Sequence, residues 1–287
     1  MINSASIVEQ AVIEQLKLST YDLPTRDKIP VIHELFEGDG QGLALDIGLG
    51  TGYTTYRVFG DRPTVCIDID AGNLRLYRDR LMAVPGVRRP MCVVAAATAL
   101  PFRTGTFRWI LASEVLEHIE DDVTAAGELS RVLSEKGAVI VTVPYSGIGF
   151  TSFLELLGIK TVHDYPGPER HVRPGYDEQS LERLVECHGL TIAAHRYYFR
   201  LFTRLTTDLV SLAHIAYQRL VHGRRSWTWA DVASVEHGSA FRLYRLSFPL
   251  LWAVSRLDVM LHRYRGFGFV AMLTKRTTDP IRRPVSP

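Results

Sequence analysis

The sequence has little cysteine and no long hydrophobic run. Its three cysteines, Cys66, Cys92 and Cys187, are spread over 287 residues, and none belongs to a CxxC pair. Zinc ribbons and disulfide-stapled folds need closely paired cysteines, so the sequence argues against both classes and favours a reducing compartment. No segment approaches the roughly 18–20 apolar residues of a membrane-spanning helix.

The N-terminal residues lack the pattern of a secretory signal. The stretch "MINSASIVEQAVIEQLKLSTY" is amphipathic, carries acids early and has no apolar core region. A signal peptide needs such an apolar region, so none is predicted. Together with the scarce cysteines, this absence predicts a cytoplasmic protein.

Negative charge is scarce in the C-terminal third. Residues 1–195 carry 18 Lys+Arg and 26 Asp+Glu, whereas residues 196–287 carry 15 and 5. A basic segment can mark an anionic partner such as nucleic acid, a membrane surface or a phosphorylated lipid. It can equally be a solvated helix face whose arginines cover apolar neighbours. Composition leaves both interpretations open.

Short apolar segments alternate with segments of helical periodicity. Expected strands are residues 43–47, 64–70, 91–97, 107–113, 138–144, 190–199 and 266–276. Expected helices are residues 5–18, 29–36, 53–59, 71–84, 122–134 (stopped by Gly137), 177–189, 201–221 and 249–264. Strands that are apolar throughout and alternate with helices predict a parallel sheet covered on both faces.

This order predicts an α/β fold. We expect a doubly wound, seven-stranded Rossmann-like sheet with a helical insertion before the last strand. The expected domain organisation has four parts. Residues 1–38 form an N-terminal helical segment, and residues 39–199 plus 266–276 form the core. Residues 200–265 form a helical insertion or cap, and residues 277–287 form a disordered tail.

The stretch "LALDIGLGTGYTT" (43–55) places glycines 48, 50 and 52 directly after the first strand. Glycines let the backbone turn sharply and approach a ligand closely. A dinucleotide-binding GxGxxG loop would need a third glycine where Tyr53 stands. Asp46 is a poor neighbour for a pyrophosphate but a good one for a cation. Its carboxylate can receive an ammonium, directly or through water, or can brace the loop.

Four segments in consistent order carry a family resemblance. "LDIGLGTG", "VCIDIDAGNL", "ATALPFRTGTFRWILASEVLEHIEDD" and "LSRVLSEKGAVIVTVP" resemble successive motifs of class I S-adenosylmethionine-dependent methyltransferases, in the branch of small-molecule and quinone-type enzymes. The resemblance covers roughly residues 40–195 and implies S-adenosylmethionine as cofactor, with S-adenosylhomocysteine as product. It also implies that Asp68, at the end of the second strand, accepts hydrogen bonds from both ribose hydroxyls.

The resemblance implies a set of cofactor-binding residues: Asp46, Gly48, Gly50, Gly52, Asp68, Ile69, Ala97 and Glu114. One departure affects it. The family often has an acid that contacts the adenine amino group where this chain has Ala96, so the backbone around Ala97 is expected to serve instead. Loss of that acid motivates an alternative, a non-catalytic regulator that only binds S-adenosylmethionine.

Glu114, Glu117 and His118 form an ExxEH cluster, which would share one face of a helical turn. The cluster resembles the metal site of some quinone O-methyltransferases and small-RNA 2′-O-methyltransferases. On that resemblance, His171 of this chain would supply a further ligand, and the ion would lower the pKa of a bound hydroxyl. The alternative, which we favour, is that Glu114 contacts the cofactor or caps the helix, while Glu117 and His118 bond to backbone groups. We therefore assign no metal ligands and take His118, Glu117 and His171 as catalytic.

The expected reaction is methyl transfer to a small-molecule or lipid-linked acceptor, at a hydroxyl oxygen. No Asn-Pro-Pro-Tyr-like turn follows the fourth strand, so methylation of nucleic-acid bases is not expected, and we predict no nucleic-acid partner. An NAD(P)-dependent oxidoreductase is a weaker alternative, opposed by the glycine spacing and the lack of a YxxxK pair. The sequence leaves the oligomeric state open.

Two segments outside the core motifs bear on the acceptor. The loop at 145–175, which holds Tyr145, Asp164, Tyr165, Arg170 and Arg173, is long enough to be a lid. The apolar, arginine-rich insertion has two interpretations. It covers a lipid-like acceptor or docks on an anionic membrane, or it is a helical cap or dimer surface.

Overall fold

The computed structural model describes residues 21–36, 41–60, 62–82, 84, 88–148, 152–159, 171–222 and 239–276. The expected helix at 5–18, the expected tail at 277–287 and the expected lid residues Asp164, Tyr165 and Arg170 lie outside these ranges.

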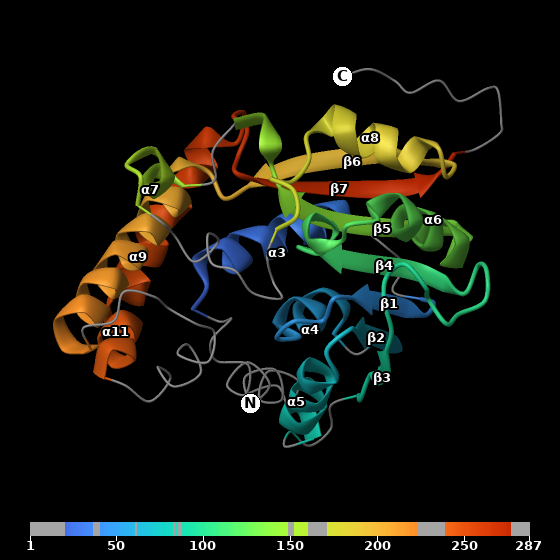
Figure 1. The fold of residues 1–287 in the computed structure, drawn as a ribbon, viewed down its shortest axis with the longest axis horizontal. Helices are drawn as coiled ribbons and strands as arrows, with labels where there is room; N and C mark the ends of the chain where they lie inside the picture. The colour runs from blue at the N-terminus through green and yellow to red at the C-terminus, as the bar shows by residue number, and fades with distance from the viewer. Residues whose placement is uncertain are drawn as a thin grey trace, which may run out of the picture.

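The protein is built on a seven-stranded sheet with the strand order β3-β2-β1-β4-β5-β7-β6 (Figure 1). The strands are β1 (Ala44–Ile47), β2 (Thr64–Asp68), β3 (Met91–Val94), β4 (Phe107–Ser113), β5 (Leu133–Pro144), β6 (Leu190–Tyr198) and β7 (Gly268–Lys275). Neighbours from β3 to β5 pair in parallel, whereas β7 runs antiparallel between β5 and β6. The predicted α/β fold is confirmed.

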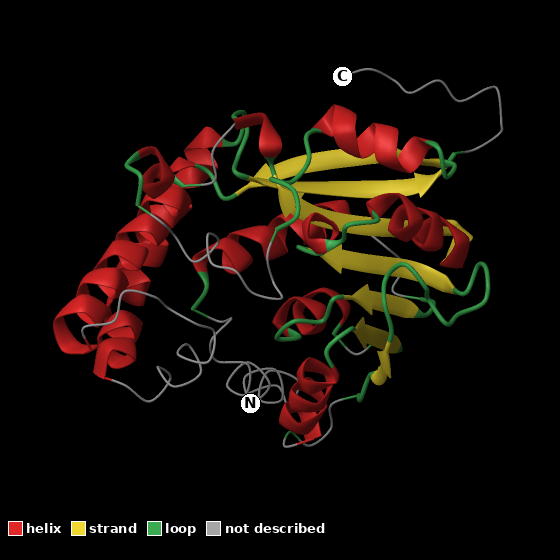
Figure 2. Ribbon diagram, viewed as in Figure 1, coloured by secondary structure: helices red, strands yellow, loops and turns green. Residues whose placement is uncertain are grey.

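Helices cover both faces of this sheet (Figure 2). They are α3 (Leu23–Leu35), α4 (Tyr53–Phe59), α5 (Ala71–Met82), η1 (Leu116–His118), α6 (Asp122–Val132), η2 (Ser146–Ile148), α7 (Phe153–Leu156), α8 (Glu178–Glu186), α9 (Leu201–His222), α11 (Ser239–Ser255) and η4 (Arg256–Leu261). One core cluster joins the sheet to α6 and α8. Two others pack α3, α4 and α5 on strand residues of the opposite face. Burial on both faces explains why the strands are apolar throughout.

The strand order reverses at β1, which pairs with β2 on one side and with β4 on the other. In open α/β sheets, ligands bind beyond the carboxyl ends of the strands at such a switch point. The glycine loop follows β1 at this place, Asp68 ends β2, and Glu114 follows β4. The topology therefore gathers most of the expected site residues at one edge of the sheet.

Several expected boundaries are wrong. The helix expected to begin at residue 249 is α11, which begins ten residues earlier at Ser239, so Pro249 lies inside it. α6 ends at Val132 because Leu133 is already extended and begins β5, so Gly137 lies inside a strand and stops no helix. α3 begins at Leu23, six residues before the expected start, because the Asp22 carboxylate caps it by accepting a 2.9 Å hydrogen bond from Thr25 N. An aspartate N-cap of this kind satisfies a backbone donor that the helix leaves unpaired.

The insertion between β6 and β7 consists of α9, α11 and η4. β6 has the same direction as β5 because both are antiparallel to β7, so α9 starts at the carboxyl edge of the parallel strands. Figure 1 shows α9 and α11 side by side at this edge. Among the described helices, none combines the length and the apolarity needed to cross a bilayer.

Candidate active site

The three glycines of the loop after β1 serve different purposes. All have positive φ, +72° at Gly48, +51° at Gly50 and +75° at Gly52. A Cβ at Gly48 would lie 2.4 Å from Val115 Cγ2, and one at Gly52 would lie 2.1 Å from the Tyr77 ring. A Cβ at Gly50 would meet nothing within 4 Å. The outer glycines therefore let neighbouring side chains pack, and Gly50 alone of the three opens onto free space.

This difference predicts that alanine has different effects at Gly52 and at Gly50. Gly52→Ala should destabilise the protein by about 3 kcal/mol, since it adds a clash with Tyr77 to the cost of positive φ. Gly50→Ala should cost only about 1 kcal/mol, yet weaken binding of S-adenosylhomocysteine. Chemical denaturation and calorimetry measure the two effects. Equal stabilities of the two variants would contradict the assignment.

Asp46 is buried beneath the loop, with 2% of its surface exposed. Its carboxylate accepts a 2.7 Å hydrogen bond from the Thr55 hydroxyl, so it braces the start of α4 against β1. The pKa of Asp46 is raised to about 7, chiefly by burial; the Thr55 hydrogen bond opposes this rise and the charge of Asp68 adds to it. A cationic ligand nearby would favour the ionised form.

Asp68 lies at the carboxyl end of β2 and holds the loop in place. Its carboxylate accepts hydrogen bonds from Gly50 N at 3.3 Å, Asp70 N at 2.8 Å and Asn73 Nδ2 at 3.3 Å. The next residue, Ile69, is 80% exposed, an unusual position for an apolar side chain beside a buried strand. Ala97 is half-buried and packs partly against the core.

These residues fit a nucleoside such as that of S-adenosylmethionine. A carboxylate can accept hydrogen bonds from sugar hydroxyls, and an exposed apolar side chain can cover a base. The open backbone at Gly50 leaves room for a ligand between them. The chemistry of the group at this edge therefore agrees with the cofactor that the sequence motifs imply.

Glu114 has a backbone conformation that side chains rarely adopt, with φ of +55°. Its amide donates to Thr142 O at 2.8 Å. Its carboxylate accepts hydrogen bonds from the Thr142 hydroxyl at 2.7 Å and the Tyr198 hydroxyl at 2.6 Å, and Lys28 Nζ lies 3.7 Å away. Strained backbone supported by so many contacts is characteristic of functional sites.

The neighbours of Glu114 decide its charge. Burial opposes ionisation, but Lys28, Tyr198 and Thr142 together outweigh it and hold the pKa of Glu114 below its ordinary value. Lys28 is itself buried and donates to the Ser113 hydroxyl at 2.9 Å. The sequence analysis missed Lys28, Thr142 and Tyr198. A lysine within the apolar stretch "KIPVI" was the available signal for the first.

Glu117 lies in η1 with 0% of its surface exposed. Among the described residues, no hydrogen-bond partner is found for either of its carboxylate oxygens. Burial, and then the negative charge of Glu114, raise the pKa of Glu117 well above its ordinary value. The pKa values of these two neighbouring carboxyl groups are therefore shifted in opposite directions, upward for Glu117 and downward for Glu114. Such divergence is typical of acid–base sites.

The structure brings His171 to the same place from a distant segment. The rings of His118 and His171 meet edge to face with centroids 4.7 Å apart. One ligand atom from each of Glu117, His118 and His171 lies within 4.8 Å of the others. Val172 N donates to Glu117 O at 2.9 Å, which joins the two segments. These three residues fit either a proton-accepting cluster or a divalent cation.

Two details differ from the expected ExxEH helix. The segment is a single 3₁₀ turn, and Glu114 precedes it, so the three residues do not share one helical face. The carboxyl group of Glu117 also does not bond to the backbone in the described structure. Arg173, expected in the lid, instead donates to Leu116 O and Glu120 O, both at 3.0 Å, and so fixes the segment that carries His171.

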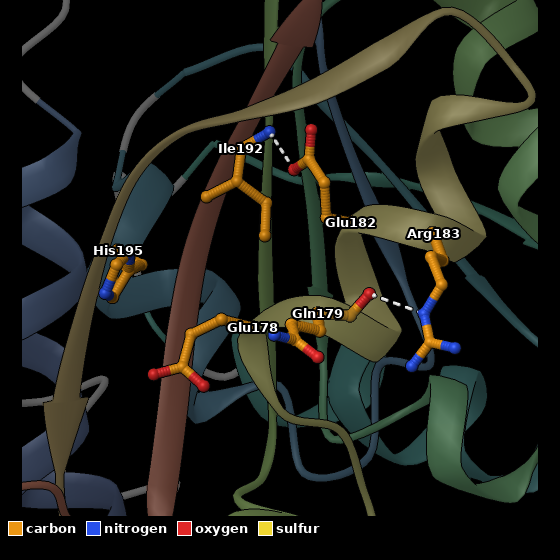
Figure 3. Close-up of a pocket in the computed structure, with 6 residues that line it drawn as sticks. All are labelled: Glu178, Gln179, Glu182, Arg183, Ile192 and His195. Carbon is orange, nitrogen blue, oxygen red and sulfur yellow. Dashed lines mark hydrogen bonds between the residues drawn. The ribbon is translucent and has the colours of Figure 1, made fainter.

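An open hollow of about 640 Å³ lies elsewhere, between α8 and β6 (Figure 3). It is lined by Glu178, Gln179, Glu182, Arg183, Ile192 and His195. Its carboxylates are already engaged, Glu178 by the hydroxyls of Tyr145 and Tyr197 and Glu182 by Thr191 and Ile192 N. None of the expected site residues lines it, so we do not assign the active site there.

Comparison with known proteins supports the resemblance. Residues 45–141 match the family described as "Methyltransferase domain", and this range contains the glycine loop, Asp68, Glu114 and Glu117. Over this range the chain is similar to methyltransferases, as the sequence motifs predicted. The match gives no support to the oxidoreductase alternative or to binding of a dinucleotide at the glycine loop.

A curated relative shares the methyltransferase domain. It is named malonyl-[acyl-carrier protein] O-methyltransferase, from Halorhodospira halophila, and is 31% identical over 149 residues, which is 51% of this chain and 44% of that protein. The chain spans less than half the length of the curated relatives it matches.

Solved structures share the fold. A candidate sarcosine dimethylglycine methyltransferase from Galdieria sulphuraria has a TM-score of 0.54 at 12% identity, over 88% of this chain and 86% of that one. The [4+2]-cyclase SpnF has a TM-score of 0.53 at 18% identity, over 88% of this chain and 81% of that one. A cyclase among methyltransferase-like structures shows that this fold alone does not determine a reaction.

Proposed function

We propose that the protein transfers a methyl group from S-adenosylmethionine to an oxygen atom of a small-molecule or lipid-linked acceptor. The observation that carries this proposal is the cluster of Glu117, His118 and His171 beyond β4, whose ligand atoms lie within 4.8 Å of one another. The name of the curated relative, an O-methyltransferase, supports an oxygen acceptor.

The residues around the glycine loop would hold the cofactor. Asp68 would accept hydrogen bonds from the sugar, Ile69 would cover the base, and Gly50 would let the ligand approach the backbone. Asp46 would favour the cationic end through its charge. When bound, S-adenosylmethionine supplies an activated methyl group on a sulfonium. The remaining task of the protein is to align the acceptor and remove its proton.

Proton removal falls to the cluster of Glu117, His118 and His171. A ring nitrogen of one histidine accepts the proton of the acceptor hydroxyl. The imidazolium then lowers the pKa of Glu117, which releases its own proton to water, so that the carboxylate balances the positive ring. After the methyl transfer the ring returns its proton to Glu117, and the net result is one proton released. A divalent cation held by the same three residues would serve the same step by lowering the pKa of the hydroxyl. Loss of turnover in a chelator, restored by a divalent cation, would distinguish the second route.

Calorimetry with two ligands tests the class of protein. We expect S-adenosylhomocysteine to bind and NADH not to bind, because the loop lacks the third glycine of a dinucleotide site. Binding of NADH alone, or of neither ligand, would refute the proposal.

An isotope-labelling experiment can identify the acceptor among the compounds of the cell. A cell extract is incubated with the protein and methyl-labelled S-adenosylmethionine, and products that gain the label are identified by mass spectrometry. We expect a labelled O-methyl product. Cofactor binding with no labelled product in extract or membrane fraction would favour the non-catalytic regulator.

A further inference from the structure

The helical hairpin of α9, α11 and η4 turns its apolar stripes outward. On α9 the exposed leucines Leu201, Leu205, Leu209 and Leu212 are three or four positions apart, and Leu220 follows about two turns later. On α11 the exposed leucines Leu243, Leu246 and Leu250 have the same spacing, and Leu257 and Met260 follow on η4. Exposure in this set ranges from 37% at Leu212 to 86% at Leu220. Single exposed leucines are ordinary, but two aligned stripes mark an interaction surface.

The inner side of this hairpin is polar. Arg204 and Asp208 form a buried ion pair at 2.7 Å, and Asp208 also accepts a hydrogen bond from the Ser152 hydroxyl. Asp258 is buried as well and accepts hydrogen bonds from Phe202 N and Thr203 N at the start of α9. Buried charged groups are thus paired on the inner side, beside the buried Phe248, while leucines face outward. Lipid-facing helices are built in this way.

The charges exposed on the hairpin have one sign. Between 201 and 222 and between 239 and 265, the described structure contains two acidic residues, Asp208 and Asp258, and both are buried. The exposed charged side chains described there are arginines: Arg242, Arg245, Arg256, Arg263 and Arg265. An apolar surface bordered by arginine alone is complementary to anionic lipid headgroups.

We propose that this hairpin docks on an anionic lipid bilayer, with its leucine stripes in the interfacial region and its arginines among the headgroups. Because no described helix could span the membrane, the contact is peripheral. A second copy of the chain is a weaker occupant of the same surface. Pairing two copies there would bring arginines together with no exposed acidic residue on the described hairpin to offset them.

Docking would also narrow the acceptor class. α9 begins at the carboxyl edge of the sheet, where Glu114 and Glu117 lie, and Tyr198 of β6 contacts Glu114 three residues before α9. Docking of the hairpin on a bilayer would therefore place the candidate active site near the lipid headgroups. This step rests on the proposed function and implies an acceptor oxygen on an amphipathic lipid.

Vesicle binding of the full chain tests the docking directly. Flotation is measured with vesicles of equal parts phosphatidylglycerol and phosphatidylcholine, and with vesicles of phosphatidylcholine alone. We expect partition into the anionic vesicles that falls with added salt. The double variant Leu246→Glu/Leu250→Glu should lower it about thirtyfold or more, because two apolar anchors become charged. The double variant Arg242→Gln/Arg245→Gln should lower it about tenfold.

The matched control is Leu76→Glu, which charges an exposed leucine on α5, outside the hairpin. It should partition as the unmodified protein does. Equal recovery of the protein with and without anionic lipid would overturn the proposal, as would a dimer in solution that Leu246→Glu dissociates. Flotation needs no cofactor and no turnover, so its result is independent of whether S-adenosylhomocysteine binds.

Discussion

Replacing Asp68 with alanine should weaken S-adenosylhomocysteine binding more than a hundredfold. Hydrogen bonds from sugar hydroxyls to a carboxylate are charge-assisted, and losing two of them costs about 3 kcal/mol or more. Asp68 stands at the end of β2 next to the exposed Ile69, in a position to receive such bonds. Isothermal titration calorimetry measures the affinity, and circular dichroism confirms that the variant is folded.

Two neighbours separate sugar binding from support of the loop. Asn73→Ala removes one of the donors to Asp68 but leaves the carboxylate, and Asp70→Ala removes an exposed carboxylate two residues later. Both should retain affinity within about threefold, since neither removes an acceptor for the ligand. If Asn73→Ala lost as much affinity as Asp68→Ala, the role of Asp68 would be to hold the loop.

The sequence predicted which residues meet at the edge of the sheet beside the glycine loop, because local patterns determine that half of the candidate site. The apolar strands, the glycines after β1 and the acid ending β2 are neighbours in sequence, and parallel strands bring their carboxyl ends together. Even here one assignment needed the structure. The sequence could not show that Gly48 accommodates Val115 and Gly52 accommodates Tyr77, because both contacts are between residues distant in sequence.

The other half of the site depends on tertiary contacts and was predicted only in part. The ExxEH spacing with His171 indicated residues that the structure brings together, but not that the pKa of Glu114 is lowered and that of Glu117 raised. Their difference arises from Lys28 on α3 and Tyr198 on β6, which are 86 and 84 residues from Glu114 along the chain. No periodicity within 114–118 carries that information.

The insertion shows a third kind of result. The periodicity of 201–221 correctly predicted a helix with an apolar stripe, and α9 spans Leu201–His222. Periodicity identifies a stripe but not what it faces. Here the inward face is occupied by Arg204, Asp208 and Thr203, so the leucines are exposed.

The variant Glu117→Gln should separate activity from stability. Glutamine has the size of the protonated side chain but cannot ionise, so it cannot balance an imidazolium beside it. We expect the turnover rate to fall by about a hundredfold to ten-thousandfold, the range for losing an acid–base group. Affinity for S-adenosylhomocysteine should not change. Single-turnover methylation of the identified acceptor and calorimetry measure the two quantities.

The same variant should become more stable than the unmodified protein as pH rises. The pKa of Glu117 is raised in the folded state from 4.5, so below pH 4.5 both states are protonated and the residue has no effect. Above it, only the unfolded chain releases the proton, which favours unfolding by about 1.4 kcal/mol for each pH unit until the folded-state pKa is reached. Glutamine removes this loss, so the difference in free energy of unfolding should grow as the pH rises above 4.5. Glu120→Gln, an exposed neighbour, should show neither effect. A stability difference that is constant with pH would mean that Glu117 is ionised in the folded protein, and the proton cluster would then have to be rejected.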